Sequence, residues 1–263
     1  MRLADFTALK EVHCSAFCSV YYALHKASKQ PVALKSYHEN DVRRRGLENN
    51  LKQERDALVK LSPKKWFITL IGAFYDQNSY WLAMEWLDGT LLKDTEHGDN
   101  DWVCEILSAL QVCQDSQIVH GDVSERNIMI TEDGRVKLID FGSCVITEQR
   151  DKGKVQASLG CVEAPEVLER GEVCFATDLW ALGCTLGRFL MGKDIHKGNS
   201  SLERMTNICN ASIAWPKTVD EKTKSFIESL TAAQAGQRLG VNKHTGLVDY
   251  EIVQRKWFDL QKT

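Results

Sequence analysis

The sequence has few of the features that mark fibrous, secreted or membrane-spanning proteins. Only 4 of its 263 residues are proline, so no proline-rich linker separates domains. The most apolar long window, Trp180 to Gly192, is too short to cross a bilayer and contains Arg188. Asp5 stands where a signal peptide would need apolar residues. We therefore expect no direct membrane segment.

The chain also lacks a large excess of charge of either sign. Its 33 Lys and Arg residues and 36 Asp and Glu residues give a formal net charge of −3. Because no basic field is present, nucleic acid is not an expected partner. The 9 cysteines include no CxxC pair, and no metal-ligand pair follows Cys14 and Cys18. Free thiols in a reducing cytosol are expected, which predicts a cytoplasmic location.

Apolar periodicity divides the chain into a β-rich part and a mainly helical part. Alternation predicts strands over residues 6–12, 19–24, 32–37, 68–75 and 80–85. A leucine stripe from Leu47 to Leu61 predicts one helix between the third and fourth of these strands. Further helices are predicted around 102–113, 178–191, 201–211, 221–230 and 248–258, with a β pair at 128–131 and 136–139.

These elements predict an α+β bilobal fold within one domain, residues 1–263. The 43% hydrophobic content is enough for a substantial core. A small β-rich lobe is expected over residues 1–88 and a larger helical lobe over 89–263. A ligand would be expected in the cleft between them.

A glutamate interrupts the apolar stripe of the first long helix. Glu54 lies between Leu51 and Leu58 on the same predicted face. Burying a carboxylate without a partner costs on the order of several kcal/mol, so a buried Glu54 needs a cation. Lys35, on a preceding strand that also carries Tyr37 on the same face, is the natural partner. The alternative is that Glu54 lies at the exposed edge of the stripe.

Residues 120–142, HGDVSERNIMITEDGRVKLIDFG, contain the groups that phosphoryl transfer requires. That reaction needs aligned phosphates, metal ions on their oxygens and a carboxylate near the attacking hydroxyl. Asp122 is placed to accept or orient the hydroxyl proton. Asn127 can ligate a metal through its amide oxygen, and Asp140 offers a hard carboxylate to Mg²⁺.

With this stretch, the sequence resembles the protein kinase superfamily over essentially its whole length. The motifs that carry the resemblance are VALK at 32–35, the catalytic loop from His120 to Asn127, DFG at 140–142, APE at 164–166, DLW at 178–180, and Arg238, which is expected to pair with the APE glutamate. A narrower resemblance to the AGC group lies in residues 53–56, 178–184, 237–240 and 256–258. Within that group the chain looks most like the phosphoinositide-dependent protein kinases.

The resemblance implies ATP with Mg²⁺ or Mn²⁺ as cofactors, and transfer to serine or threonine hydroxyls of protein substrates in a signalling role. The implied catalytic residues are Lys35, Glu54, Asp122 and Arg126, and the implied metal ligands are Asn127 and Asp140. The implied nucleotide-binding residues are Val12, Val20, Ala33, Lys35, Met84, Glu85, Leu87 and Met129. Residues 85–87 would form the hinge that pairs with adenine, and Leu58, His120 and Phe141 would stack in the core.

Three departures from the family pattern bear on activity. His13, Ser15 and Cys18 stand at the glycine positions of the phosphate-binding loop, which predicts weaker ATP affinity. Gly121 replaces the arginine that, in the family, binds a phosphorylated residue of the activation segment. In this segment Ser158 is either the phosphosite or an ordinary surface serine. Ser124 replaces a lysine that neutralises the γ-phosphate, a charge that Arg126 could supply instead.

Two further questions stay open at this point. The arginines at 43–45 are either a solvated charge run or a docking site for the phosphorylated tail of a client kinase. The chain as a whole is either an active kinase or a pseudokinase that serves as a nucleotide-binding scaffold or allosteric module. A third reading is a small-molecule phosphotransferase, because the His-Gly-Asp triplet is similar to the catalytic loop of such enzymes.

Overall fold

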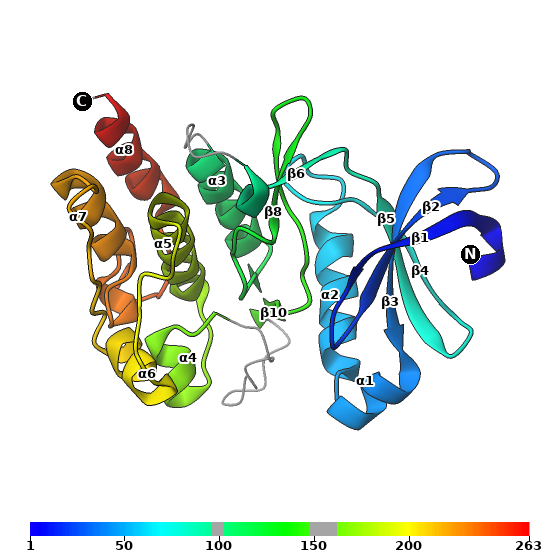
Figure 1. Cartoon of the computed structure of the whole chain (residues 1–263), viewed down its shortest axis with the longest axis horizontal. Helices are drawn as coiled ribbons and strands as arrows, with labels where there is room; N and C mark the ends of the chain where they lie inside the picture. Colours follow the sequence, from blue (N-terminus) through cyan, green and yellow to red (C-terminus); the bar gives the residue numbers. More distant parts are fainter. Residues whose placement is uncertain (96–101, 148–161, 263) are drawn as a thin grey trace.

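A five-stranded antiparallel sheet forms the core of the smaller lobe. The computed structural model describes residues 1–95, 102–147 and 162–262 (Figure 1). Its sheet has the order β1-β2-β3-β5-β4. The strands are β1 (Phe6–Cys14), β2 (Ser19–His25), β3 (Pro31–His38), β4 (Leu70–Asp76) and β5 (Ser79–Glu85), preceded by the 3-10 helix η1 (Leu3–Asp5).

The strand register shows which side chains lie on each of the two faces of this sheet. Lys35 lies opposite Val20 on β2, and Ala33 lies opposite Met84 on β5. Because residues at alternate positions share a face, all four side chains lie on one side of the sheet. The other face has its own small core, made of Phe6, Ala23, Val32, Leu34, Trp81 and Ala83. One face is thus closed by packing, and the face that carries Lys35 is turned toward the rest of the molecule.

Two helices, rather than the single predicted one, follow β3. They are α1 (Glu39–Arg45) and α2 (Glu48–Leu61), separated at Gly46, whose φ of 66° is left-handed. Glycine adopts this conformation without a steric cost, and so it ends α1 before the leucine stripe begins. Figure 1 places α2 on the side of the small lobe that faces the large lobe.

The larger lobe is mainly helical, as predicted. Its helices are α3 (Trp102–Asp115), α4 (Pro165–Arg170), α5 (Phe175–Met191), α6 (Ser201–Cys209), α7 (Glu221–Leu230) and α8 (Tyr250–Gln261), with 3-10 turns η2 (Leu92–Asp94) and η4 (Ala235–Gln237). Its short strands are β6 (Gly89–Leu91), β7 (Ile118–Val119), β8 (Ile128–Thr131), β9 (Val136–Leu138) and β10 (Val145–Ile146). The predicted α+β bilobal fold is therefore confirmed.

Some predicted boundaries moved for local reasons. Helix α5 begins at Phe175 rather than Asp178, because the Thr177 hydroxyl accepts the Cys174 N–H and fixes an earlier turn. Helix α8 begins at Tyr250 rather than Val248, because the Asp249 side chain caps the N–H of Ile252. Every helix in the described part of the chain is too short or too polar to span a lipid bilayer.

A buried ion pair fixes the arrangement of helices in the large lobe. Arg238 donates to both carboxylate oxygens of Glu166, at 2.8 and 2.7 Å, as predicted from the sequence. The guanidinium also donates to the carbonyl of Ala176 and lies over the ring of Trp180. The bidentate geometry joins the start of α4 and the first turns of α5 to the segment after α7.

Candidate active site

Lys35 stands at the meeting point of three elements. Its Nζ lies 2.7 Å from Oε1 of Glu54 on α2 and 2.8 Å from Oδ1 of Asp140, which follows β9. Lys35 is 4% exposed and Glu54 is 1% exposed, so the predicted pair is confirmed and the exposed-edge alternative is wrong. Burial opposes the charge of Lys35, but the Asp140 and Glu54 carboxylates outweigh it and raise the pKa of Lys35. The contact therefore joins β3, α2 and the large lobe around one positive charge.

Asp140 has an unusual backbone conformation, and its side chain is 44% exposed. Its φ of 59° is left-handed, a region that aspartate tolerates better than most residues. Oδ1 accepts the N–H of Gly142 at 2.9 Å as well as the Lys35 ammonium. Partial burial opposes ionisation, but Lys35 outweighs it and lowers the pKa of Asp140 to about 2. The carboxylate is thus ionised at neutral pH.

Asp122 and Asn127 form a second polar pair, in the catalytic loop. The Asn127 amide Nδ2 donates to Asp122 Oδ2 at 2.7 Å and to the Asp122 carbonyl at 2.9 Å. Burial, and next the negative charge of Asp140, raise the pKa of Asp122 to about 6. Arg126 is exposed, and its charge acts in the opposite direction on the same carboxyl group.

The donor set of these residues fits a magnesium ion. Among the described residues, no hydrogen bond is made to Oδ2 of Asp140 or to Oδ1 of Asn127. Both are hard oxygens, and Mg²⁺ is commonly bound by one or two protein ligands together with phosphates and waters. No cluster of three His, Cys, Asp or Glu side chains suited to a metal occurs in the part of the chain that the structure describes. The predicted ligands therefore suit an ion that arrives with a nucleotide.

Side chains of α5 hold the backbone of the catalytic loop by hydrogen bonds. The carboxylate of Asp178, 1% exposed, accepts the N–H groups of His120 and Gly121 at 2.9 and 2.8 Å. Burial raises the pKa of Asp178 to about 7, and the two N–H donors oppose that shift. The Thr185 hydroxyl adds a third bond, to the Val123 carbonyl at 2.8 Å. Gly121 has a φ of 79°, so this position needs a residue that adopts the left-handed conformation without a steric cost.

The imidazole of His120 packs beneath the loop. Its ring lies 4.7 Å from that of Phe141 at an interplanar angle of 69°, and both side chains are fully buried, so the predicted contact in the core is confirmed with edge-to-face geometry. Leu58 belongs to the same buried cluster. Burial lowers the pKa of His120 to about 4, so the ring is neutral and its Nδ1 can accept the Asp122 N–H at 3.2 Å. Ser124 is also buried, and its hydroxyl has no hydrogen-bond partner among the described residues.

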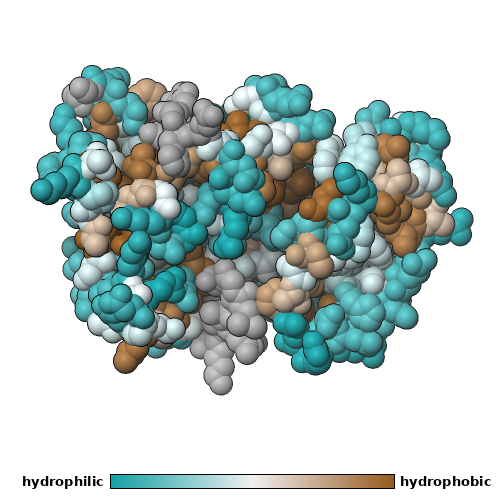
Figure 2. All heavy atoms as spheres, in the orientation of Figure 1, coloured by the Kyte–Doolittle hydropathy of each residue, from teal (hydrophilic) through white to brown (hydrophobic). Residues whose placement is uncertain are grey.

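The predicted adenine-binding residues fall into three groups. Val20, Ala33 and Met84 share the face of the sheet that carries Lys35, whereas Met129 belongs to β8 of the large lobe. Val12 is 47% exposed and lies where the pairing of β1 with β2 is irregular, so the register does not assign it to this face and its place at the nucleotide stays a prediction. Figure 2 shows apolar residues reaching the surface in the hollow between the two lobes.

The connection between the lobes is held by an ion pair that the sequence did not reveal. Lys137 on β9 donates to Oε1 of Glu85 at 2.6 Å and to the Phe67 carbonyl at 3.0 Å. The same Glu85 oxygen accepts the Thr69 N–H at 2.8 Å. The carboxylate of Glu85 is thus engaged within the fold, and the contact of its backbone with the nucleotide stays a prediction. Leu87, the other predicted hinge residue, follows β5 and is half-buried.

In the loop that aligns with the glycine-rich loop, a side chain accepts hydrogen bonds from the loop's own backbone N–H groups. The Ser15 hydroxyl accepts the N–H groups of Phe17 and Cys18, at 3.2 and 3.1 Å, and donates to the Cys18 carbonyl. The Phe17 ring packs against the guanidinium of Arg45, 4.8 Å away. In a phosphate-binding loop such N–H groups would point at the ligand. Here the Ser15 hydroxyl, rather than a phosphate oxygen, accepts them.

The arginines at 43–45 all have partners within the chain. Arg43 pairs with Glu39, Arg44 pairs with Asp41, and Arg45 packs on Phe17. These contacts give no support to a phosphorylated client tail, which remains a prediction. Ser158, the other predicted phosphate-related site, lies outside the described residues.

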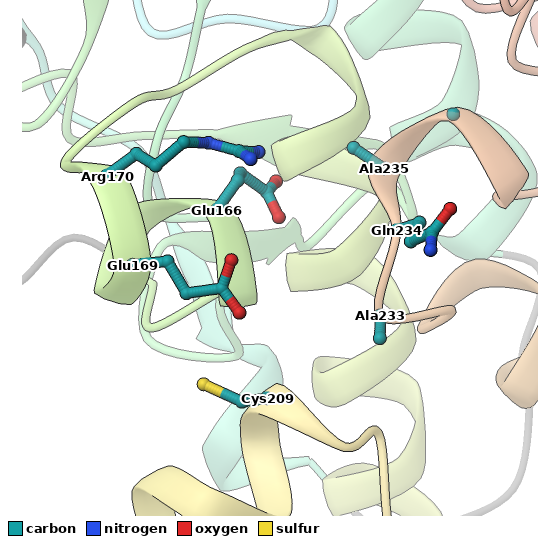
Figure 3. Close-up of a pocket in the computed structure, with 8 residues that line it drawn as sticks. Glu166, Glu169, Arg170, Cys209, Ala233, Gln234 and Ala235 are labelled. Carbon is teal, nitrogen blue, oxygen red and sulfur yellow. The ribbon is translucent and has the colours of Figure 1, made fainter.

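A separate cavity of about 550 Å³ lies in the large lobe, away from Lys35. It is lined by Glu166, Glu169, Arg170, Cys209 and residues 233–236. Figure 3 shows Glu166 and Glu169 projecting from α4 toward this space, opposite Gln234. Because the Glu166 carboxylate is held by Arg238 and Thr177, that side chain is engaged in the fold.

Comparison with known proteins agrees with this geometry. Residues 8–258 match the model of the protein kinase domain. An Aurora kinase of Patiria pectinifera is 26% identical over 97% of this chain and 64% of its own length. An Aurora kinase of Candida glabrata is 28% identical over 93% of this chain and 71% of its own length. Human 3-phosphoinositide-dependent protein kinase 1 is 25% identical over 93% of this chain.

The chain spans only part of the length of these relatives, 46% in the case of the human protein. The Aurora kinases and the phosphoinositide-dependent kinase are similar to the chain to nearly the same degree. The comparisons therefore do not favour the AGC group over others.

The raised pKa of Asp122 predicts an acid limb in the pH profile. If its carboxylate accepts the acceptor proton, activity requires the ionised form, which is lost as pH falls through about 6. We expect kcat/KM for ATP, with Mg²⁺ in excess, to be level near pH 7.5 and to fall about tenfold per unit well below pH 6. A profile that stays level to pH 5, while circular dichroism shows an intact fold, would contradict this role.

The Ser15 contacts predict that glycine at this position improves nucleotide binding. Ser15→Gly releases the N–H groups of Phe17 and Cys18, each worth roughly 0.5–1.5 kcal/mol in a new hydrogen bond. We expect the Kd for ATP, measured by calorimetry, to fall about threefold or more. Ser28→Gly, in the β2–β3 turn, is the matched control and should leave the Kd unchanged. Equal or weaker binding in Ser15→Gly would show that the loop does not contact phosphate.

Proposed function

The chain belongs to the protein kinase domain family, and we propose that it is an active kinase that transfers the γ-phosphate of ATP to serine or threonine hydroxyls of protein substrates. Membership of the family implies ATP, a divalent metal ion and protein substrates as ligands. The single observation that carries the proposal of activity is the Lys35 contact with Glu54 and Asp140. In kinases this lysine–glutamate pair and the metal-binding aspartate must both be in place for transfer.

Each group in the cleft has a task in this reaction. The Lys35 ammonium would neutralise phosphate oxygens while Glu54 holds it. The second oxygen of Asp122, the one not bound by Asn127, would take the proton of the acceptor hydroxyl. The acceptor oxygen forms a bond to the γ-phosphorus as the bond from that phosphorus to the ADP oxygen breaks. A magnesium ion, when bound through Asp140 and Asn127, would offset the negative charge of the phosphates.

The choice of acceptor has weaker support than the reaction itself. The AGC-like motifs in residues 178–184 and 237–240 favour serine and threonine. The buried Ser124 supplies no charge to the γ-phosphate, whereas Arg126 is exposed and close enough to act electrostatically on Asp122. Arg126 is therefore the candidate for the missing cation. A specific likeness to the phosphoinositide-dependent kinases, a client tail at residues 43–45 and a cytoplasmic location remain predictions.

A pseudokinase is the second candidate, because of one specific observation. The Ser15 hydroxyl occupies N–H groups of the phosphate-binding loop, as would suit a module that binds nucleotide weakly. The Lys35 contacts and the open oxygens of Asp140 and Asn127 weigh against it, since a scaffold requires neither. A small-molecule phosphotransferase is disfavoured by the match to the protein kinase domain and by the Glu166–Arg238 pair.

Label transfer separates the first two candidates. The protein is incubated with radiolabelled ATP, Mg²⁺ or Mn²⁺ and generic protein acceptors, and the labelled amino acids are then identified. We expect phosphoserine or phosphothreonine in the wild type. Loss of the proton acceptor in Asp122→Asn should reduce transfer on the order of a hundredfold or more.

The matched control is Asp133→Asn in the β8–β9 turn, where the carboxylate pairs with exposed Arg135. It should transfer label as the wild type does. If the wild type transfers no more label than Asp122→Asn, the proposal of activity fails. An ATP-dependent rise in melting temperature in that same sample would then favour the pseudokinase.

A further inference from the structure

A tyrosine lies inside the Lys35 cluster without a role in the resemblance to kinases. Tyr37 follows Lys35 on β3 at alternate spacing, so the two side chains share one face of the sheet. Its hydroxyl donates to Oε2 of Glu54, and its ring lies 5.3 Å from Lys35 Nζ. Tyr37 is 7% exposed, so this bond is shielded from water.

The two donors from β3 divide the Glu54 carboxylate between them. Lys35 binds Oε1 and Tyr37 binds Oε2. An ammonium alone is a point charge about which a carboxylate can rotate. Two donors on the same strand fix the plane of the carboxylate and therefore the orientation of α2 relative to β3. Without the phenol, Oε2 would be a buried acceptor that lacks its hydrogen bond, a costly state.

The phenol also reaches the large lobe. The position of a Cβ atom on Gly142 would lie 3.7 Å from the Tyr37 hydroxyl and 3.7 Å from Lys35 Nζ. It would lie 3.1 Å from Oδ1 of Asp140. The Tyr37 hydroxyl is thus adjacent to the segment that carries the metal-binding aspartate, and it contacts Glu54 at the same time.

We propose that Tyr37 is a positioning residue for phosphoryl transfer: its hydroxyl holds Glu54, and through Glu54 holds Lys35, in the geometry that receives the phosphates. The inference rests on the proposed function. When Lys35 turns its ammonium toward phosphate oxygens, its contact with Glu54 is shared with the nucleotide. The Tyr37 bond does not depend on the nucleotide, so it keeps α2 in place during the reaction.

The principal test compares Tyr37→Phe with Tyr80→Phe. Tyr80 lies directly opposite Tyr37 on β5, and it also packs against the main core. Both changes keep an aromatic ring and remove one hydroxyl, but only the first removes a donor to Glu54. For Tyr37→Phe we expect kcat to fall about tenfold while KM for ATP changes less than threefold, because Lys35 still binds the phosphates but is misaligned. Tyr80→Phe should resemble the wild type.

Hydrogen exchange supplies a readout that needs no activity. Amides of residues 48–61 should exchange faster in Tyr37→Phe than in Tyr80→Phe. If the wild type transfers no phosphate, the proposed function fails, and Tyr37 is then judged by this exchange alone. Equal kcat and equal exchange in the two variants would overturn the positioning role.

A graded substitution covers the case in which Tyr37→Phe does not fold. Incorporating 3-fluorotyrosine and 3,5-difluorotyrosine at position 37 makes the hydroxyl a progressively stronger acid with little change in ring volume. A positioning role predicts that kcat, or α2 exchange in an inactive protein, changes in step across the series. A residue that serves only in packing would give the same value for all three side chains.

Discussion

The ammonium of Lys35 contacts Glu54 on α2 and Asp140 in the large lobe, and so holds three elements around one charge. The buried Glu54 carboxylate is tolerable because the ammonium pairs with it, and the ammonium stays charged because both carboxylates face it. The two lobes are joined at this point as well as through the chain between them. The Lys137–Glu85 pair provides a second contact between the lobes, at the end of β5. The cleft is therefore defined by charge pairing at both ends.

The catalytic loop depends on a different kind of support. Asp178 holds two of its N–H groups, and α5, which carries Asp178, is itself fixed through Arg238 and Glu166. Buried polar contacts thus connect Arg238, through Glu166 and α5, to the catalytic loop that carries Asp122. The residues proposed to react are thus positioned by groups that lie outside the proposed nucleotide site. The bonds to Gly121 N–H and to the Val123 carbonyl are made although residues 121 and 124 depart from the family pattern.

Several of these features follow from the sequence, and others do not. Glu54 was predictable because helical periodicity placed it on an apolar face, where a carboxylate needs a cation. Alternation along β3 likewise placed Tyr37 beside Lys35, but its hydroxyl bond depends on how close α2 approaches. The Lys137–Glu85 pair joins strands far apart in the chain, so no local pattern reports it. Ser15 was expected only to weaken the loop, because the turn it closes depends on the backbone path through Phe17 and Cys18.

We infer that Lys35 and Asp140 hold a nucleotide together with a metal ion in the cleft. The most direct measurement is calorimetric titration of ATP into the wild type and into Asp140→Asn, with and without Mg²⁺. We expect Mg²⁺ to strengthen ATP binding at least several-fold in the wild type, and we expect Asp140→Asn to abolish this gain. Binding that is independent of Mg²⁺ in the wild type, or a gain of equal size in both proteins, would contradict it.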